Sequence, residues 1–116
     1  KDMINRGGYK IYTAEVENAL SEHLGVVESA VVGRPCPVLG ERVHAFVTLR
    51  DAAVTAEALK GFCAERLSDY KVPETFTLLE APLPRNANGK VMKRQLRQGM
   101  NCELNLEVRH PGLKGR

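Results

Sequence analysis

The chain has 116 residues and a formal net charge of +3, with 43% hydrophobic and 27% charged residues. This length suits one small domain that buries roughly two thirds of its unfolded surface, and the composition is that of an ordinary soluble globular domain. No apolar run approaches the ~20 residues of a membrane span, and so mild a charge does not favour a nucleic acid or a membrane as partner.

The cysteine pattern points to a reducing compartment. Cys36, Cys63 and Cys102 are widely spaced, which argues against a disulfide framework or a zinc site. No signal peptide is visible. Because the chain starts at Lys1 and runs directly into a dense motif, we expect it to be part of a longer protein.

A β-hairpin is the first predicted element, with strands at residues 3–5 and 9–12. Gly7 and Gly8 stand between them and supply the positive φ angles of a tight turn without a Cβ clash. Most such pairs are turns and nothing more. The functional alternative is that the bare backbone lets a thin substrate lie against the main-chain amides.

Apolar spacing predicts two helices, each begun by a threonine N-cap at Thr13 or Thr55. The first carries Val16, Leu20 and Leu24 and ends at Gly25; the second carries an apolar stripe that includes Cys63. Strands are predicted at residues 26–32, 42–49 and 75–79, a loop at residues 33–37, and a short basic helix at residues 91–96.

This order predicts a small α+β fold: a three-stranded mixed sheet with flanking helices, plus an N-terminal β-hairpin at one edge. We expect residues 1–98 to form the domain. Residues 99–116 are polar, contain Gly and Pro and lack periodicity, so they are expected to be disordered or a non-native extension.

The histidines and Cys63 receive structural interpretations. His23, His44 and His110 have no metal-ligand spacing, so no metal site is predicted. His44 is expected to face out of its strand. Cys63 is expected to be a small core residue rather than a nucleophile. Nucleic-acid binding has little support, since three Phe, three Tyr and no Trp offer few stacking surfaces.

The stretch PRNANGK, residues 84–90, is predicted to be a mobile surface loop. It is not a phosphate-binding P-loop, because Pro84 stands where that motif needs Gly and Val91 where it needs Ser or Thr. An isolated Gly-Lys is usually a solvated turn. The alternative is that Lys90 swings into an active site and neutralises charge that develops on a phosphate or carboxylate.

Five segments together resemble the small C-terminal domain of the adenylate-forming enzymes, from Lys1 to about Arg97. That superfamily includes acyl-CoA synthetases, peptide-synthetase adenylation domains and beetle luciferases. The segments occur in the family's order: KDMINRGGYKIYTAEVENAL, VVESAVVGRP, GERVHAFVTL, LSDYKVPE and LPRNANGKVMKRQLR.

The resemblance implies an AMP-forming acid–thiol ligase. A carboxylic acid attacks ATP to give an acyl-adenylate and pyrophosphate, and the thiol of CoA then displaces AMP. It further implies an N-terminal domain of the same chain that holds the ATP pocket, the acyl pocket and most Mg²⁺ contacts. The fragment alone is therefore expected to be inactive, and the parent to be a cytoplasmic enzyme of fatty acid metabolism.

The resemblance also implies roles for individual residues. Lys90 matches the catalytic lysine of the adenylation step, and Lys1 matches the hinge about which the domain turns. Residues of the hairpin would line the tunnel for the pantetheine arm of CoA: Gly7, Gly8, Tyr9 and Lys10. The pattern Pro-x-x-x-x-Gly-Lys further suggests that Lys90 is silenced by acetylation, which would remove its charge.

The sequence departs from the family at several positions. Thr13 replaces a common Pro, Cys36 a common Asp, and Leu39 a basic residue of some relatives. The basic residue that some relatives place near Ala64 for the CoA 3′-phosphate is missing, and only Lys60 or Arg66 could substitute.

Two alternatives remain. Peptide-synthetase adenylation domains usually end in Gly-Lys-Val-Asp-Arg, whereas residues 89–94 read GKVMKR, which favours an acyl-CoA synthetase. A non-catalytic interaction module that kept the fold is the other alternative. A large upstream domain with a Ser/Thr/Gly-rich phosphate loop would support the enzyme.

Overall fold

The computed structural model describes residues 2–98 and the backbone of residues 107–110. In chain order the elements are β1 (Met3–Arg6), β2 (Tyr9–Tyr12), α1 (Thr13–Ser21), β3 (Val26–Cys36), β4 (Gly40–Leu49), α2 (Ala56–Ala64), a 3₁₀ turn (Asp69–Lys71), β5 (Thr75–Leu79), α3 (Lys93–Gln98) and β6 (Glu107–His110).

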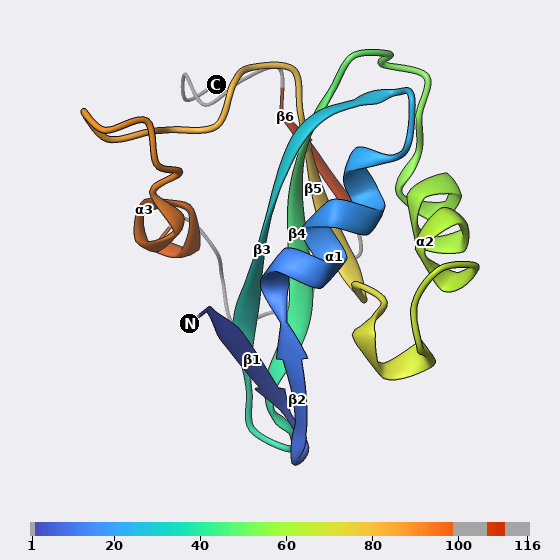
Figure 1. The fold of residues 1–116 in the computed structure, drawn as a ribbon, viewed down its shortest axis with the longest axis vertical. Helices are drawn as coiled ribbons and strands as arrows, with labels where there is room; N and C mark the ends of the chain where they lie inside the picture. Colours follow the sequence, from blue (N-terminus) through green and yellow to red (C-terminus); the bar gives the residue numbers. More distant parts are fainter. Residues whose placement is uncertain (1, 99–106, 111–116) are drawn as a thin grey trace.

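Strands β3, β4 and β5 form the centre of a mixed sheet (Figure 1). β3 runs antiparallel to β4, and β5 runs parallel to β4. The antiparallel β1–β2 hairpin meets β4 where Arg6 pairs with Gly40, and β6 pairs in parallel with β5. The predicted α+β fold is therefore confirmed, and the hairpin and β6 extend the sheet.

Different helices cover the two faces of this sheet. Because successive residues of a strand point to opposite faces, β4 contributes to two clusters. The first packs beneath α1 and α2 and includes Val16, Leu20, Val43, Ala45, Val47, Leu59, Cys63, Phe76 and Leu78. The second packs beneath α3 and comprises Ala30, Val32, Phe46, Leu79, Leu83 and Leu96.

The prediction of a loop at residues 33–37 is wrong for residues 33–36, which belong to β3. β3 continues to Cys36, and its pairing with β4 runs on to that residue, opposite Gly40. Pro35 is tolerated because β3 pairs only with β4 among the described strands, and proline is acceptable in an edge strand.

Two predictions about α1 are also wrong. Thr13 is the first helical residue rather than the cap, and the capping position, Tyr12, makes no side-chain cap. α1 ends at Ser21, so Leu24 lies beyond it and is 88% exposed instead of joining the apolar stripe. The N-cap at Thr55 is confirmed, since its side chain accepts a hydrogen bond from the Ala58 amide.

The basic helix α3 begins at Lys93, two residues later than predicted. Residues 99–106 and 111–116, on which the expectation of disorder largely falls, lie outside the described residues. Between them, residues 107–110 form β6. The division into residues 1–98 and 99–116 therefore stays a prediction.

Candidate functional site

The segment that carries Lys90 is organised by the side chain of Asn86. Its Oδ1 accepts hydrogen bonds from the amides of Asn88, at 2.9 Å, and Lys90, at 3.0 Å. The backbones of Asn86 and Lys90 are joined by a further bond of 2.9 Å. Gly89 closes the turn with a φ of +84°, which other residues rarely adopt. The backbone that leads to Lys90 thus has a defined hydrogen-bonded shape.

The base of this segment is fixed to the rest of the domain. Arg85 forms an ion pair with Glu28 of β3, and its Nη1 donates to the Gly89 carbonyl at 2.8 Å. The Leu83 amide donates to the same Glu28 carboxylate at 2.8 Å, and Leu83 is itself buried. These contacts tie the segment to β3 although residues 85–90 are themselves exposed.

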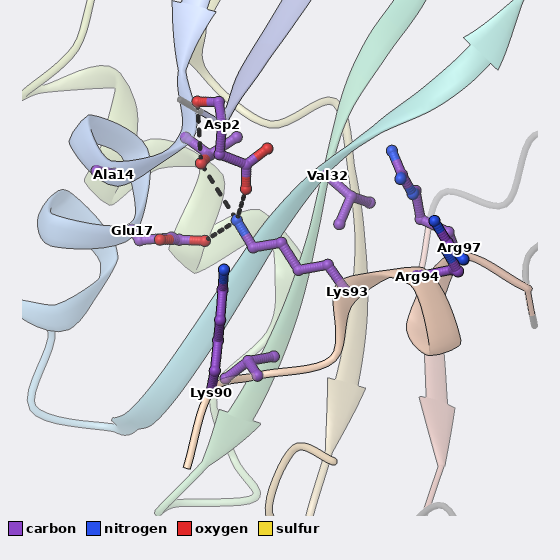
Figure 2. A pocket seen from close by; sticks show the side chains of 10 residues that line it. Asp2, Ala14, Glu17, Val32, Lys90, Lys93, Arg94 and Arg97 are labelled. Atoms are coloured by element: carbon purple, nitrogen blue, oxygen red, sulfur yellow. Dashed lines mark hydrogen bonds and ion pairs between the residues drawn. The ribbon is translucent and has the colours of Figure 1, made fainter. Parts of the chain in front are cut away.

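Lys90 points into a cavity of about 570 Å³ between α1 and α3 (Figure 2). The cavity is lined by Asp2, Thr13, Ala14, Glu17, Val32, Lys90, Val91, Lys93, Arg94 and Arg97. The Lys90 side chain is exposed, and no acceptor or carboxylate among residues 2–98 pairs with its ammonium. A bound anion could therefore meet an uncompensated positive charge here.

Lys93 lies in the same cavity, but its charge is compensated. Its Nζ pairs with the carboxylate of Asp2, approaches Glu17 Oε2 at 2.8 Å and donates to Thr13 Oγ1 at 3.2 Å. Burial alone would raise the pKa of Asp2, but the hydrogen bond and the charge of Lys93 lower it overall. The Thr13 hydroxyl thus contacts Lys93, and Thr13 itself is the first helical residue rather than the cap.

The hairpin turn lies at the other end of the sheet. Gly7 and Gly8 have φ angles of +58° and +94°, as a two-residue hairpin requires. The Gly7 amide donates to the Leu39 carbonyl at 2.8 Å and the Gly8 amide to Asn5 Oδ1 at 3.1 Å. A Cβ at Gly7 would approach Leu39 to 3.0 Å, whereas nothing lies within 4 Å of a Cβ at Gly8. Gly8 therefore presents open backbone.

Tyr9 and Lys10 continue the hairpin. The Tyr9 ring stacks on Tyr70 with a centroid distance of 4.5 Å and remains 56% exposed. Lys10 is exposed, with no ion-pair partner among residues 2–98. The strand before the turn is held by Arg6, whose Nε lies 2.6 Å from a Glu74 carboxylate oxygen. The turn is thus anchored while its outer surface stays open.

The structure does not bring Lys90 and the hairpin together. The hairpin turn lies near one end of the long axis, and the segment before α3 lies toward the other (Figure 1). None of the four hairpin residues lines the Lys90 cavity. The predicted hinge, Lys1, lies outside the described residues. The predicted roles of Lys1, Lys90 and the hairpin residues remain predictions.

Sequence reasoning noted Lys93 only as part of a basic helix end, and it missed Asn86 and the two carboxylates that hold Lys93. A signal existed for Asn86, because Asn side chains commonly accept hydrogen bonds from backbone amides shortly after them in turns. No local signal could identify the Lys93 partners, since Asp2 and Glu17 lie far from it in the sequence and meet it only through the tertiary fold.

The prediction for Cys63 is confirmed, and the prediction for His44 is wrong. Cys63 is fully buried in the first cluster, and burial raises its pKa to about 11. His44 is 3% exposed instead of facing solvent. It lies on the second sheet face and hydrogen-bonds to Thr75 and Thr77.

The described residues offer no fitting magnesium site. They gather no group of three His, Cys, Asp or Glu side chains suited to a metal ion, and the carboxylates in the cavity, Asp2 and Glu17, are both occupied by Lys93. Within the same residues, no helix has the length and apolarity to cross a membrane.

Comparison with known proteins gives a consistent result. A family model described as the AMP-binding enzyme C-terminal domain matches residues 15–90. A Rhodococcus jostii CoA ligase for a methyl-dioxo-octahydroindenyl propanoyl group is 46% identical over 99 residues, which are 84% of this chain and 19% of that protein. A Salmonella typhimurium long-chain-fatty-acid–CoA ligase is 42% identical over 97 residues, with 84% of this chain and 17% of the relative covered.

A solved structure is similarly close. The o-succinylbenzoate CoA synthetase of Bacillus subtilis, in complex with its acyl-adenylate intermediate, matches with a TM-score of 0.77 and 41% identity. The match covers 89% of this chain and 21% of that structure. The chain thus spans about a fifth of the length of the relatives that it matches.

Proposed function

Because this chain belongs to the family of AMP-binding enzyme C-terminal domains, we propose that it is the C-terminal part of an ATP-dependent acid–CoA ligase. The two ends of its sheet serve the two steps of the reaction. The remaining catalytic groups, the ATP and acyl pockets and the Mg²⁺ contacts belong to an N-terminal domain of the same protein. The fragment alone is inactive.

Lys90 acts in the first step. A carboxylate oxygen of the acid attacks the α-phosphorus of ATP, and pyrophosphate leaves with the bonding electrons. Negative charge accumulates on the phosphate oxygens, and an ammonium placed beside them stabilises the transition state. The observation that carries this role is the Lys90 ammonium, which projects into the cavity and pairs with no carboxylate among residues 2–98, since Asp2 and Glu17 pair with Lys93.

The hairpin acts in the second step. The thiol of CoA attacks the acyl carbon of the adenylate, and AMP leaves. Gly8 supports this role, since its backbone has no neighbour on the side where a Cβ would stand, so a narrow pantetheine chain can approach it closely. Gly7, Tyr9 and Lys10 flank the same path.

The proposal also covers the acid that the parent protein uses and the part of the cell in which it acts. The parent acts on a small carboxylic acid in the cytoplasm, within fatty acid metabolism. Identifying the acid requires the N-terminal domain, because none of the residues described near Lys90 forms an acyl pocket.

The test compares the two half-reactions in the full-length protein that carries this chain. Pyrophosphate release is measured over a panel of acids, and CoA-dependent consumption of supplied acyl-adenylate is measured separately. Lys90→Ala is expected to slow adenylation on the order of 10²- to 10³-fold and to spare the second step. Gly8→Ala is expected to do the reverse.

Equal pyrophosphate release by wild type and Lys90→Ala would refute the role of Lys90. No pyrophosphate release by the wild type with any acid would instead favour a non-catalytic module.

A further inference from the structure

Lys93 makes the densest set of polar contacts in the Lys90 cavity. Its ammonium reaches Asp2, Thr13 and Glu17, which come from the start of the chain and from α1 (Figure 2). Both partner residues make a further hydrogen bond, Asp2 through its backbone and Glu17 through its carboxylate. The Asp2 carbonyl accepts from the Thr13 amide at 3.2 Å, and Glu17 Oε2 accepts from the Val31 amide at 2.9 Å. Lys93 is thus tied to a rigid frame.

Helix α3 depends on such ties. It has six residues, too few for a helix to be stable by itself in water. Leu96 packs it on the second sheet face, and Lys93 holds its first residue against α1. Because Lys90 lies three residues before Lys93, the position of α3 determines where the Lys90 side chain starts.

Charge provides the second argument. Asp2 and Glu17 line the cavity into which Lys90 projects, and Lys93 occupies both. Without Lys93, the partly buried Glu17 carboxylate and the more exposed Asp2 carboxylate would lose their ion pair, and the unpaired Lys90 ammonium lines the same cavity, together with Arg94 and Arg97. Attraction between opposite charges is stronger at the less solvated carboxylate, Glu17.

We propose that Lys93 is a positioning residue for Lys90: by occupying Asp2 and Glu17, it keeps the Lys90 ammonium unpaired and directed at the reacting carboxylate and phosphate. This inference rests on the proposed function. Lys93 touches no reactant, and its effect passes entirely through Lys90.

The experiment uses the full-length protein and both half-reactions. Lys93→Met is expected to slow adenylation on the order of 10- to 100-fold, the cost of a misplaced catalytic group, and to change the second step by less than about threefold. Lys93→Arg, which retains the cation, is expected to restore adenylation. Lys93→Met combined with Glu17→Gln is expected to recover part of the loss, because one carboxylate that captures Lys90 is gone.

Two further variants separate positioning from other roles. In a Lys90→Ala background, adding Lys93→Met is expected to cost nothing more, because the two residues act as a unit. The matched control is Lys71→Met. Lys71 also pairs with α1, through Glu15 at 3.0 Å, and its side chain is 20% exposed against 23% for Lys93. Its loss is expected to leave adenylation unchanged.

Normal adenylation by Lys93→Met would overturn the inference. So would an equal loss in both half-reactions, no recovery with Glu17→Gln, or an additional loss in the Lys90→Ala background. A wild-type protein that releases no pyrophosphate would refute the proposed function instead, so the two failures are distinguishable.

Discussion

His44 shows how a buried polar residue is accommodated in this domain. Its two ring nitrogens lie 2.5 Å from Thr75 Oγ1 and 2.8 Å from Thr77 Oγ1, and its ring meets the Phe46 ring edge-on. Burial, with a smaller contribution from the charge of Arg34, lowers its pKa to about 4 from 6.5. The imidazole is therefore neutral in the folded protein at physiological pH.

This shift predicts acid sensitivity. Between pH 6.5 and 4 the unfolded chain binds a proton at His44 that the folded chain does not, so stability falls as pH falls. The difference between the folded and unfolded pKa values of His44 corresponds to up to about 3 kcal/mol. Urea denaturation at several pH values should show this loss. His44→Gln should lower overall stability but flatten the slope above pH 4.5, and an unchanged slope would contradict the assignment.

Arg34 is a buried cation whose hydrogen-bonding groups are only partly satisfied among the described residues. It is 5% exposed, and its Nε and Nη2 have no hydrogen-bond partner among the described residues. A buried charge without an acceptor costs free energy. Arg34→Met is thus expected to raise the free energy of unfolding by about 1–3 kcal/mol, measured by urea denaturation.

Arg50→Met, at an exposed position, is the control and should change stability by less than about 0.5 kcal/mol. A loss of stability in Arg34→Met would contradict this prediction.

For single residues, the sequence correctly predicts those properties that depend on the neighbouring residues in the chain. The roles of Cys63 and Thr55 follow from an apolar stripe and a helix start, and both are confirmed. The burial of His44 and Arg34 could not be predicted in this way. Both lie on the β3–β4 ladder, where α3 and Leu83 cover the second face, and a covering segment so distant in sequence leaves no mark on the strand pattern.

Among the elements, the Lys90 segment has a shape set by one side chain. Asn86→Ala removes the acceptor of two backbone amides, including that of Lys90. Under the proposed function, this change should slow adenylation by roughly 10-fold or more through a misplaced lysine. Asn88→Ala is the matched control, since the Asn88 side chain makes no hydrogen bond or ion pair among the described residues while its backbone does. Equal effects of the two variants would refute the role of Asn86.

The hairpin and α1 show where element prediction succeeds and fails. The Gly7-Gly8 turn follows from steric chemistry that acts within four residues, and it is confirmed. α1 begins one residue earlier than the cap motif predicts, so Thr13 is already helical, and its amide and hydroxyl contact Asp2 and Lys93. Lys93 lies far from the helix in sequence, so a local cap motif carries no information about it.

For the whole molecule, both covered sheet faces contribute to stability, but only the face under α3 is expected to affect the proposed adenylation step. Leu59 of α2 and Leu96 of α3 are both buried, one in each cluster. Truncation to Ala should cost about 2–4 kcal/mol of stability in either case. Only Leu96→Ala should also slow adenylation at temperatures where both variants remain folded, because α3 supports Lys90. Equal adenylation rates would show that α3 packing does not orient Lys90.

The junction between Arg6 and Gly40 has a consequence for how such domains change over evolutionary time. The hairpin pairs with β4 in the sheet ladder at that one position, and none of its turn residues lines the cavity that receives Lys90. A lineage can therefore exchange the hairpin turn for another sequence without compensating substitutions around Lys90. The sequence of the hairpin turn, proposed to contact CoA, can therefore vary among relatives while the residues around Lys90, proposed for adenylation, stay the same.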